Sequence, residues 1–494
     1  MSDGIRDVLN GANALYKGAK VTLSYMFKKK FCVQYPEEKH PVPPRFRGKL
    51  RIQDTIDSPI APVTWQQAVA IKDKEGEMPP CMEACPDHQH ARDYIRFIMQ
   101  KQYLLGLQIS RLTMPYSGCL GRICTRPCEK ACRMGEEGEP IAICQLKRFV
   151  ADWARENVPM DQWDPVVDKV PGAERYHIAI IGGGPAGMTS AHMLGREGYR
   201  VTVYERLPIL GGYLAVGIPP QRLPRNVLEA ENQSVLRYGV EARLNCKVGE
   251  DISFMEIYEK HDAVLLASGA TTPFMLGIPG ENLPGVFKGE YFLEDYCLGQ
   301  DFKMGPKVVV IGLGLSGVDC ARVARTLGGE DVTFVERMPR AYAGAPEHEI
   351  LEAEAEGIKV LDSVSATQFM EKDGKVCGLE IIKMDPSERD TNGRPLPKPI
   401  EGTKFVLPAD TVISAISRTA NFSYLPTDMG FQFKRNKTIV VDEKFMTHVP
   451  GVFASGDAVI GAYTVIAAMG QARFASDNIK AFLATREPRR GQGR

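Results

Sequence analysis

Seven of the twelve cysteines of this 494-residue chain lie in one short region, between residues 81 and 144. In a reducing compartment, clustered cysteines are more often metal ligands than disulfides. Thiolates are the usual ligands of iron-sulfur clusters, so the cysteines predict a site of single-electron chemistry. A zinc site with short loops, or a group of reduced buried thiols, remains the alternative. The seven candidate ligands are Cys81, Cys85, Cys119, Cys124, Cys128, Cys132 and Cys144.

A glycine loop, Gly182-x-Gly184-x-x-Gly187, follows an apolar strand at 177–181 and opens a helix at 186–197. Its first glycine allows a tight turn, its second lets the backbone approach a pyrophosphate, and its third lets helix and strand pack closely. The helix N-terminus stabilises the phosphate charge. Glu205 ends the next strand, where it would accept hydrogen bonds from an adenosine ribose. Together these features predict a dinucleotide site rather than a structural turn.

A second loop, Gly312-x-Gly314-x-x-Gly317, repeats this arrangement after a strand at 307–311. Glu336 ends the following strand, and a carboxylate there suits a free ribose hydroxyl and repels a 2′-phosphate. Arg337 and Arg340 come directly afterwards and could pair with a phosphate instead. We therefore expect a nicotinamide site that prefers NADH over NADPH.

A third signature, Gly456-Asp457, ends the apolar run at 451–455, and Thr464 precedes a helix at 466–474. A carboxylate at the mouth of a sheet can accept hydrogen bonds from the ribityl hydroxyls of a flavin, although it could also be an ordinary turn residue. Combined with the two loops, it indicates that one loop holds FAD and the other a nicotinamide. A flavin takes up hydride and releases single electrons, so it would connect a nicotinamide to an iron-sulfur cluster. No acid or base is assigned to the hydride transfer.

These motifs need two Rossmann-like units, because strand, loop and helix alternate from residue 176 to the C-terminus. We expect an α/β fold in which the nicotinamide domain is inserted into the FAD domain, behind a helical iron-sulfur domain. The strand near Thr411 is expected to resume the first domain. The expected ranges are an arm at 1–60, an iron-sulfur domain at 61–165, FAD segments at 175–295 and 411–494, and a nicotinamide domain at 296–410.

Composition narrows the functional classes. The 61 basic and 61 acidic residues argue against a generic nucleic-acid binder. There is no run of eighteen apolar residues and no signal-peptide pattern at the start, so we expect a soluble, cytoplasmic protein. A disulfide reductase would need a cysteine pair just after the first Rossmann unit, and none lies between Gly187 and Cys246.

From 79 to 471 the chain resembles the small subunit of bacterial glutamate synthase and its relatives. The shared motifs are Cys81-x3-Cys85-Pro86, Gly121-Arg122-Ile123-Cys124 with Cys128 and Cys132, 140–143, both glycine loops, 211–212, 217–219 with 222–224, and Gly456-Asp457. The resemblance implies FAD on the first loop and the nicotinamide nucleotide on the second. The cofactor-binding candidates are Gly182, Gly184, Pro185, Ala186, Gly187, Glu205, Arg206, Gly212, Tyr213, Leu214, Arg222, Ala267, Ser268, Gly269, Gly312, Gly314, Leu315, Ser316, Gly317, Glu336, Arg337, Gly456, Asp457 and Thr464.

The chain departs from this family in three places. The Cys-x-x-Cys that often opens the series is missing from 72–78, and Lys147 lies near a position where relatives use Gln or Glu as a ligand. A protonated lysine cannot be a ligand, whereas Cys119 and Cys144 are additional thiols that could take over. We expect one 4Fe-4S cluster and leave a second open. Val335-Glu336-Arg337 replaces the Tyr-Arg-Arg of NADPH-using relatives, and Ser417 replaces a usual glycine.

The segment 34–48 contains four prolines and reads as an extended arm, which either lies on a partner or packs as a tail. With the residues before it, from Val21, it resembles the segment leading into the ferredoxin-like iron-sulfur subunit of respiratory complex I. This implies docking to other redox subunits, with peripheral membrane association through the arm. We expect electrons to pass between NADH, FAD, the cluster and a partner subunit, in either direction. The alternatives are a glutamate synthase small subunit and a non-catalytic assembly subunit.

Overall fold

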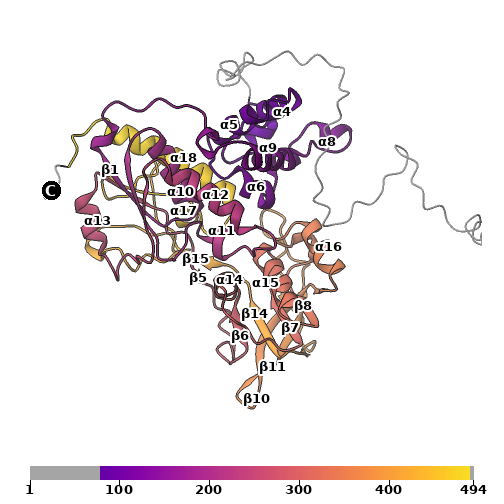
Figure 1. The fold of residues 1–494 in the computed structure, drawn as a ribbon. Helices are drawn as coiled ribbons and strands as arrows, with labels where there is room; N and C mark the ends of the chain where they lie inside the picture. The colour runs from indigo at the N-terminus through magenta and orange to yellow at the C-terminus, as the bar shows by residue number, and fades with distance from the viewer. Residues whose placement is uncertain (1–77, 490–494) are drawn as a thin grey trace, which may run out of the picture. The chain divides into compact units, whose positions relative to one another are not determined.

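The computed structural model describes residues 78–489 of the chain (Figure 1). The arm expected over residues 1–60, with its predicted docking role, lies outside these residues, and so does the start of the helical domain. Within the described part, no helix combines the length and the apolar character needed to cross a bilayer.

The cysteine-rich region folds into short helices around an apolar core of its own, which includes Phe97, Ile109 and Val150. Gly121 is a close-packing point in this domain. A Cβ atom at Gly121 would lie 2.6 Å from the Cβ of Arg148, so glycine lets two of the helices meet. The helices are α3 (Pro80–Glu83), α4 (Ala91–Met99), α5 (Tyr103–Arg111), α6 (Ser117–Ile123), α7 (Pro127–Lys130), α8 (Met134–Glu137) and α9 (Ile143–Asn157).

The first Rossmann unit is a parallel sheet of five strands in the order β16-β4-β1-β2-β3. Ile178 and Ile180 of β1 enter one core while Ala179 and Ile181 enter another, as expected for a strand covered on both faces. The strands are β1 (His177–Ile181), β2 (Arg200–Tyr204), β3 (Glu241–Arg243), β4 (Ala263–Leu266) and β16 (Val452–Ala454). The helices around them include α10 (Pro185–Arg196), α11 (Tyr213–Val216), α12 (Arg225–Leu236), α13 (Phe254–Lys260), α17 (Asp457–Ile460) and α18 (Val465–Leu483).

The second Rossmann unit is also a parallel sheet, with strand order β6-β14-β7-β8-β9. Helices form a core on one face, and a small antiparallel sheet covers the other. The strands are β6 (Val286–Lys288), β7 (Lys307–Ile311), β8 (Asp331–Val335), β9 (Lys359–Leu361) and β14 (Thr411–Ser414). The helices are α14 (Gly289–Cys297), α15 (Leu315–Thr326) and α16 (Glu347–Ala355), and the antiparallel strands are β10 (Val364–Lys372), β11 (Lys375–Asp385), β12 (Lys398–Pro399) and β13 (Phe405–Pro408).

The position of β14 corrects one expectation. The strand near Thr411 does not resume the first domain, because β14 pairs with β7 and β6 inside the second sheet. The first sheet resumes only at β16. A short apolar strand fits the middle of any parallel sheet, so its sequence does not tell which sheet it joins. The α/β class, with one Rossmann unit inserted into the other behind a helical domain, is confirmed.

The two segments that cross between the Rossmann units pair with each other. Strand β5 (Thr272–Pro273) leaves the first unit and β15 (Arg418–Thr419) returns to it, and the two form an antiparallel ribbon. Arg418 lies at the start of the return segment. Both connections therefore pass through a single place in the fold.

A buried carboxylate holds the helical domain against the first Rossmann unit. Asp164 accepts hydrogen bonds from Arg111 at 2.6 Å, from Arg237 at 2.7 Å and from the hydroxyl of Tyr238 at 3.0 Å. His192 of α10 lies 3.1 Å from the same carboxylate. Burial raises the pKa of Asp164, but the charges and hydrogen bonds of Arg111 and His192 together outweigh burial and hold this pKa well below its ordinary value. Asp164 is therefore the anionic centre of this interface.

We expect Asp164→Asn to destabilise the protein by about 3–5 kcal/mol, because the substitution leaves the guanidinium of fully buried Arg111 without its counter-charge. Urea denaturation followed by circular dichroism would measure the change. Asp168→Asn, at an exposed position nearby, is the matched control and should change the stability by less than about 0.5 kcal/mol. Equal stability of the two variants would contradict a central role for Asp164.

Candidate functional site

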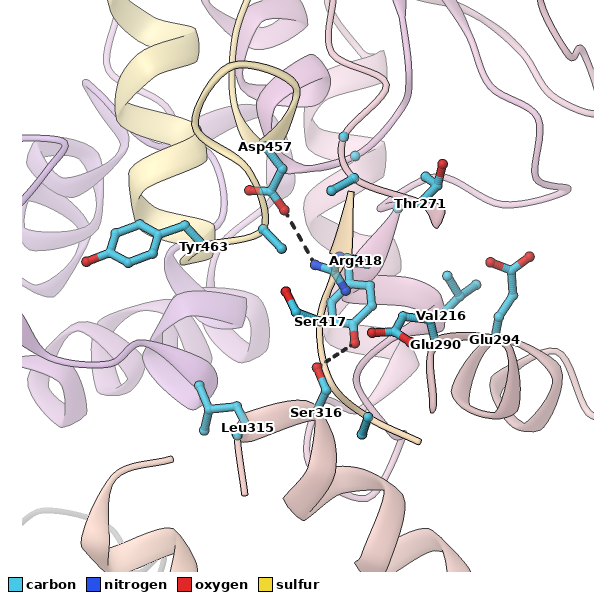
Figure 2. A pocket seen from close by; sticks show the side chains of 18 of the residues that line it. Val216, Thr271, Glu290, Glu294, Leu315, Ser316, Ser417, Arg418, Asp457 and Tyr463 are labelled. Carbon is cyan, nitrogen blue, oxygen red and sulfur yellow. Dashed lines mark hydrogen bonds and ion pairs between the residues drawn. The ribbon is translucent and has the colours of Figure 1, made fainter. Parts of the chain in front are cut away.

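A cavity of about 1310 Å³ is lined by both glycine loops, by Asp457 and by Cys124. It exceeds the ~300–1,000 Å³ that is usual for a single small ligand. Figure 2 shows Ser316 of the second Rossmann unit on the opposite side of the view from Asp457 of the first, with Arg418 between them. Residues from all three domains thus meet around one space.

The first glycine loop has the geometry that its sequence predicts. Gly182 has a φ of 110°, and a Cβ atom there would lie 2.3 Å from the carbonyl oxygen of Ala267. A Cβ atom on Gly187 would lie 1.9 Å from the carbonyl oxygen of Gly182. Neither position has room for a side chain. The loop backbone is therefore left bare at the N-terminus of α10, where a phosphate would be stabilised.

The second loop repeats this geometry. Gly312 has a φ of 104°, and a Cβ atom on Gly317 would lie 2.1 Å from the carbonyl oxygen of Gly312. Gly314 has an extended backbone and no atom within 4 Å of a Cβ position, so its surface is open to the cavity. Two equivalent phosphate-binding turns therefore open into the same space.

Each acidic residue at the strand ends braces its own loop. Glu205 accepts hydrogen bonds from the backbone N–H groups of Gly183 at 2.7 Å and Leu207 at 2.8 Å. Glu336 does the same with Leu313 at 2.8 Å and Met338 at 2.9 Å. Burial raises the pKa of Glu205. Both oxygens of each carboxylate already accept a backbone hydrogen bond, so these residues stabilise the turns whatever they contribute to a ribose.

Arg418 connects the two sides of the cavity, although it belongs to no recognisable sequence motif. Its guanidinium lies 3.4 Å from the Asp457 carboxylate and 3.5 Å from the centre of the Tyr213 ring. The Tyr213 hydroxyl is 2.8 Å from that of Ser316 in the second Rossmann unit. Figure 2 shows the Asp457 carboxylate joined to Arg418 by a dashed line. Burial raises the pKa of Asp457, while Arg418 favours its charged form.

Several buried polar atoms on the cavity wall have no hydrogen-bond partner among the described residues. They are Nε of Arg418, Oγ of Ser455 and Oε2 of Glu290. Buried polar groups are normally satisfied, so these atoms fit a bound polar ligand. Burial raises the pKa of Glu290, which the sequence analysis did not single out. A lone glutamate at a helix start carries no motif that would reveal it.

Ser417 explains one departure from the family pattern. Its φ of 96° is a conformation that glycine adopts readily and other residues rarely do. A glycine at this position would meet the same backbone requirement without strain. Ser417 also lines the cavity, between the end of the second sheet and Arg418 (Figure 2).

The cavity gathers most of the predicted cofactor residues and separates a few of them. Gly187, Leu214, Gly317 and Gly456 do not line it but lie behind the turns. Arg206 is paired with Glu294 at 2.7 Å, and Arg222 is paired with Asp319 at 3.1 Å. The predicted residues that line the cavity are Gly182, Gly184, Pro185, Ala186, Glu205, Arg206, Gly212, Tyr213, Arg222, Ala267, Ser268, Gly269, Gly312, Gly314, Leu315, Ser316, Glu336, Arg337, Asp457 and Thr464.

The cysteines divide into separate groups. Cys119 has a partner of its own, since its backbone N–H donates to the buried carboxylate of Glu231 at 2.9 Å and its thiol is hydrogen-bonded to the same group. Burial lowers the pKa of Lys147, but the thiols of Cys124, Cys144, Cys85 and Cys128 outweigh it and raise the pKa to about 12. Four of the seven predicted ligands therefore surround one buried ammonium group.

Within residues 78–489, no three His, Cys, Asp or Glu side chains converge closely enough to bind a single metal ion. A 4Fe-4S cluster places iron and sulfide atoms between its cysteine ligands, so it needs thiols that are more widely spaced. The chemistry of the Lys147 group, four thiols in a buried helical domain, fits such a cluster. Cys124 belongs to this group and also lines the cavity.

Helix α18 ties the Cys85 turn to the cavity. A Cβ atom at Gly470 would lie 2.2 Å from the carbonyl oxygen of Pro86, so helix and turn are in direct contact. Arg473 of the same helix pairs with fully buried Asp87 at 3.2 Å. The N-cap of this helix is Thr464, which lines the cavity.

Two protein-family models match the chain. Residues 176–472 match the pyridine nucleotide-disulphide oxidoreductase model. Residues 70–158 match a model described as dihydropyrimidine dehydrogenase domain II, 4Fe-4S cluster. The second match supports the iron-sulfur character of the helical domain.

Three relatives illustrate the similarity. The beta subunit of NADP(+)-dependent formate dehydrogenase from Moorella thermoacetica is 37% identical over 86% of this chain and 62% of its own length. The beta subunit of NADPH-Fe(3+) oxidoreductase from Geobacter sulfurreducens is 36% identical over 82% and 63%. The putative glutamate synthase (NADPH) small chain of Cereibacter sphaeroides is 36% identical over 74% and 90%. The chain thus spans less than two thirds of the first two relatives.

Among solved structures, Mycobacterium tuberculosis FprA in complex with NADPH superimposes with a TM-score of 0.55 and 22% identity, over 63% of this chain and 85% of that one. This likeness supports the fold. Together with the family match over residues 176–472, it shows that the chain belongs to the pyridine nucleotide-disulphide oxidoreductase family and is an oxidoreductase of the group that includes glutamate synthase small chains.

Proposed function

We propose that this chain passes electrons from NADPH, through FAD in the cavity, to an iron-sulfur cluster and then to an acceptor on a partner subunit. One observation carries the proposal: a single cavity is lined by both dinucleotide loops and by Cys124 of the thiol group around Lys147. A bound flavin would supply the conversion between hydride transfer and single-electron release. The relatives are named as subunits of larger enzymes, which supports a partner subunit as acceptor.

The chain's own residues have distinct parts in this proposal. The first loop, with Asp457 and Thr464, would hold FAD, and the second loop would hold the nicotinamide nucleotide. Arg418 would orient the flavin, since it is paired with Asp457 and has an unsatisfied Nε on the cavity wall. The hydroxyl groups of Tyr213 and Ser316 lie 2.8 Å apart and link the two sides of the cavity.

NADPH is proposed in place of the NADH expected from Glu336. Glu336 already uses both carboxylate oxygens on backbone N–H groups, so its presence is explained without a ribose. The exposed side chains of Arg337 and Arg394 both line the cavity, where they could bind a 2′-phosphate. Arg340 is instead paired with Glu347 and Glu354. The NADPH and NADP(+) in the names of the relatives support this preference.

A second candidate is the small subunit of a glutamate synthase. The putative small chain from Cereibacter sphaeroides aligns over 90% of its length, which favours a shared role. Adding a glutamate synthase large subunit and glutamine would test it, and glutamate formation driven by NADPH would support it. Docking through the arm, a complex I-like partner, a cytoplasmic location and peripheral membrane association also remain proposals.

The direct test is anaerobic addition of NADPH to protein loaded with FAD and iron. We expect the visible flavin absorbance to bleach and an EPR signal of a reduced cluster to follow. A flavin that stays oxidised would rule out the oxidoreductase role. Bleaching without a cluster signal would rule out the relay but leave the nicotinamide chemistry intact.

Replacing Arg337 or Arg394 with alanine should raise the KM for NADPH about ten- to hundredfold, because each substitution removes a charge-assisted hydrogen bond of about 1.5–3 kcal/mol. The KM for NADH should change little. Arg435→Ala is the control, since Arg435 is exposed and does not line the cavity. Equal effects on both nucleotides would argue against 2′-phosphate recognition.

Arg418→Met should weaken FAD binding about tenfold or more, because it leaves the partly buried Asp457 without its cation and removes a donor from the cavity. Flavin fluorescence during dilution of the holoprotein would measure the dissociation constant. Arg418→Lys keeps the charge and should lose less. Unchanged flavin affinity in Arg418→Met would exclude Arg418 from the flavin site.

A further inference from the structure

We propose that the cluster nearest the cavity is bound by Cys85, Cys124, Cys128 and Cys144, and that the ammonium group of Lys147 beside it sets its reduction potential. This inference rests on the proposed function and specifies the ligands and the tuning of its cluster. In it, Cys144 takes the fourth ligand place, and Lys147 acts as a fixed positive charge instead of a ligand.

The four thiols lie near two buried side chains, those of Lys147 and Tyr94. Lys147 and Tyr94 are 5% and 1% exposed, so both lie inside the helical domain. The same four cysteines act electrostatically on both of them. Burial and the nearby Cys132 raise the pKa of the Cys81 thiol, so Cys81 has a different cysteine neighbour. The set of four is therefore a spatial group and does not depend on spacing in the sequence.

Backbone hydrogen bonds hold the side chains of Cys144 and Cys124 close to each other. The Cys144 N–H, at the start of α9, donates to Glu129 at 2.8 Å, which fixes this end of the helix. The Cys144 thiol points to the carbonyl oxygens of Leu120 at 3.3 Å and Gly121 at 3.6 Å, next to Cys124. Cys124 Sγ accepts a hydrogen bond from the backbone N–H of Arg126 at 3.4 Å, as cluster ligands commonly do.

The remaining predicted ligands do not complete a second site among the described residues. Cys119 is hydrogen-bonded to Glu231 at the contact with α12. Only Cys81 and Cys132 are left, and a cluster of this kind normally takes four protein ligands. The described domain therefore supplies one full ligand set.

Lys147 lies three residues after Cys144 on α9, so both side chains leave the same face of the helix. Its ammonium group has no lone pair and cannot bind iron while it is protonated. When the cluster accepts one electron from the flavin, the site gains one negative charge and no bond forms or breaks. A buried positive charge beside it stabilises the reduced form and raises the reduction potential.

Lys147→Met tests the electrostatic role. In an EPR-monitored redox titration with dithionite and mediators, we expect the ratio of reduced to oxidised cluster at a fixed potential to fall at least tenfold, which corresponds to about 59 mV for one electron. Lys147→Arg should restore most of the ratio, and Lys130→Met, at an exposed position, should leave it unchanged. An unchanged ratio in Lys147→Met with full iron content would overturn the tuning role.

The ligand set is tested by iron content. The reconstituted protein should hold about four iron atoms per FAD, and Cys144→Ala should lose the cluster EPR signal. Cys119→Ala should keep both the iron content and the EPR signal. Cys320→Ala removes a buried thiol from the second Rossmann unit and controls for the loss of a thiol alone. Bound FAD reports correct folding of each variant. Full iron in Cys144→Ala, or iron loss in Cys119→Ala, would overturn the assignment.

These measurements use dithionite and iron analysis, so they do not depend on reduction by NADPH. A failed NADPH reaction with normal iron content and potential would count against the proposed function alone. Normal NADPH reduction of the flavin, with an unchanged potential in Lys147→Met, would count against the inference alone.

Discussion

The packing of the helical domain against the first Rossmann unit is the constraint on which the rest of the structure depends. Asp164 carries it, because it holds Arg111 of the helical domain together with His192 and Arg237 of the first unit. Removal of one partner from such a buried network leaves an uncompensated charge. The folded protein then loses several kcal/mol of stability. The contact places Cys124 on the wall of the cavity that both glycine loops line.

Features encoded by local sequence could be predicted well. Each glycine loop specifies its own turn, since Gly182 and Gly312 need positive φ and the third glycines have no room for a side chain. Features that depend on tertiary contacts could not be predicted. Arg418 and Glu290 belong to no local motif. The pairing of β14 could not be predicted because a short apolar strand is compatible with either of the two parallel sheets. Cys119 is distinguished from the other cysteines by its hydrogen bond to Glu231, which lies over a hundred residues away in the sequence.

The acidic residues at the strand ends show how a motif can serve two purposes. Glu205 and Glu336 are read from sequence as ribose acceptors, yet each binds two backbone N–H groups and holds a turn in place. A residue that has such a structural role is weak evidence about whether the site binds NADH or NADPH. The preference for NADH expected from Glu336 depended on the ribose role alone, whereas Arg394 reaches the cavity from a distant loop that the motif does not include.

Helix α18 has a consequence for the rate of the proposed electron transfer. It begins at Thr464 on the cavity wall and touches the Pro86 turn at Gly470, six residues later and about 9 Å along the helix axis. Electron tunnelling slows exponentially with separation, so a spacer that varied in length would make the transfer rate fluctuate. A hydrogen-bonded helix keeps its length, and both contacts move with it. In the proposed relay, this helix would therefore hold the cavity and the cysteine turn at a constant separation.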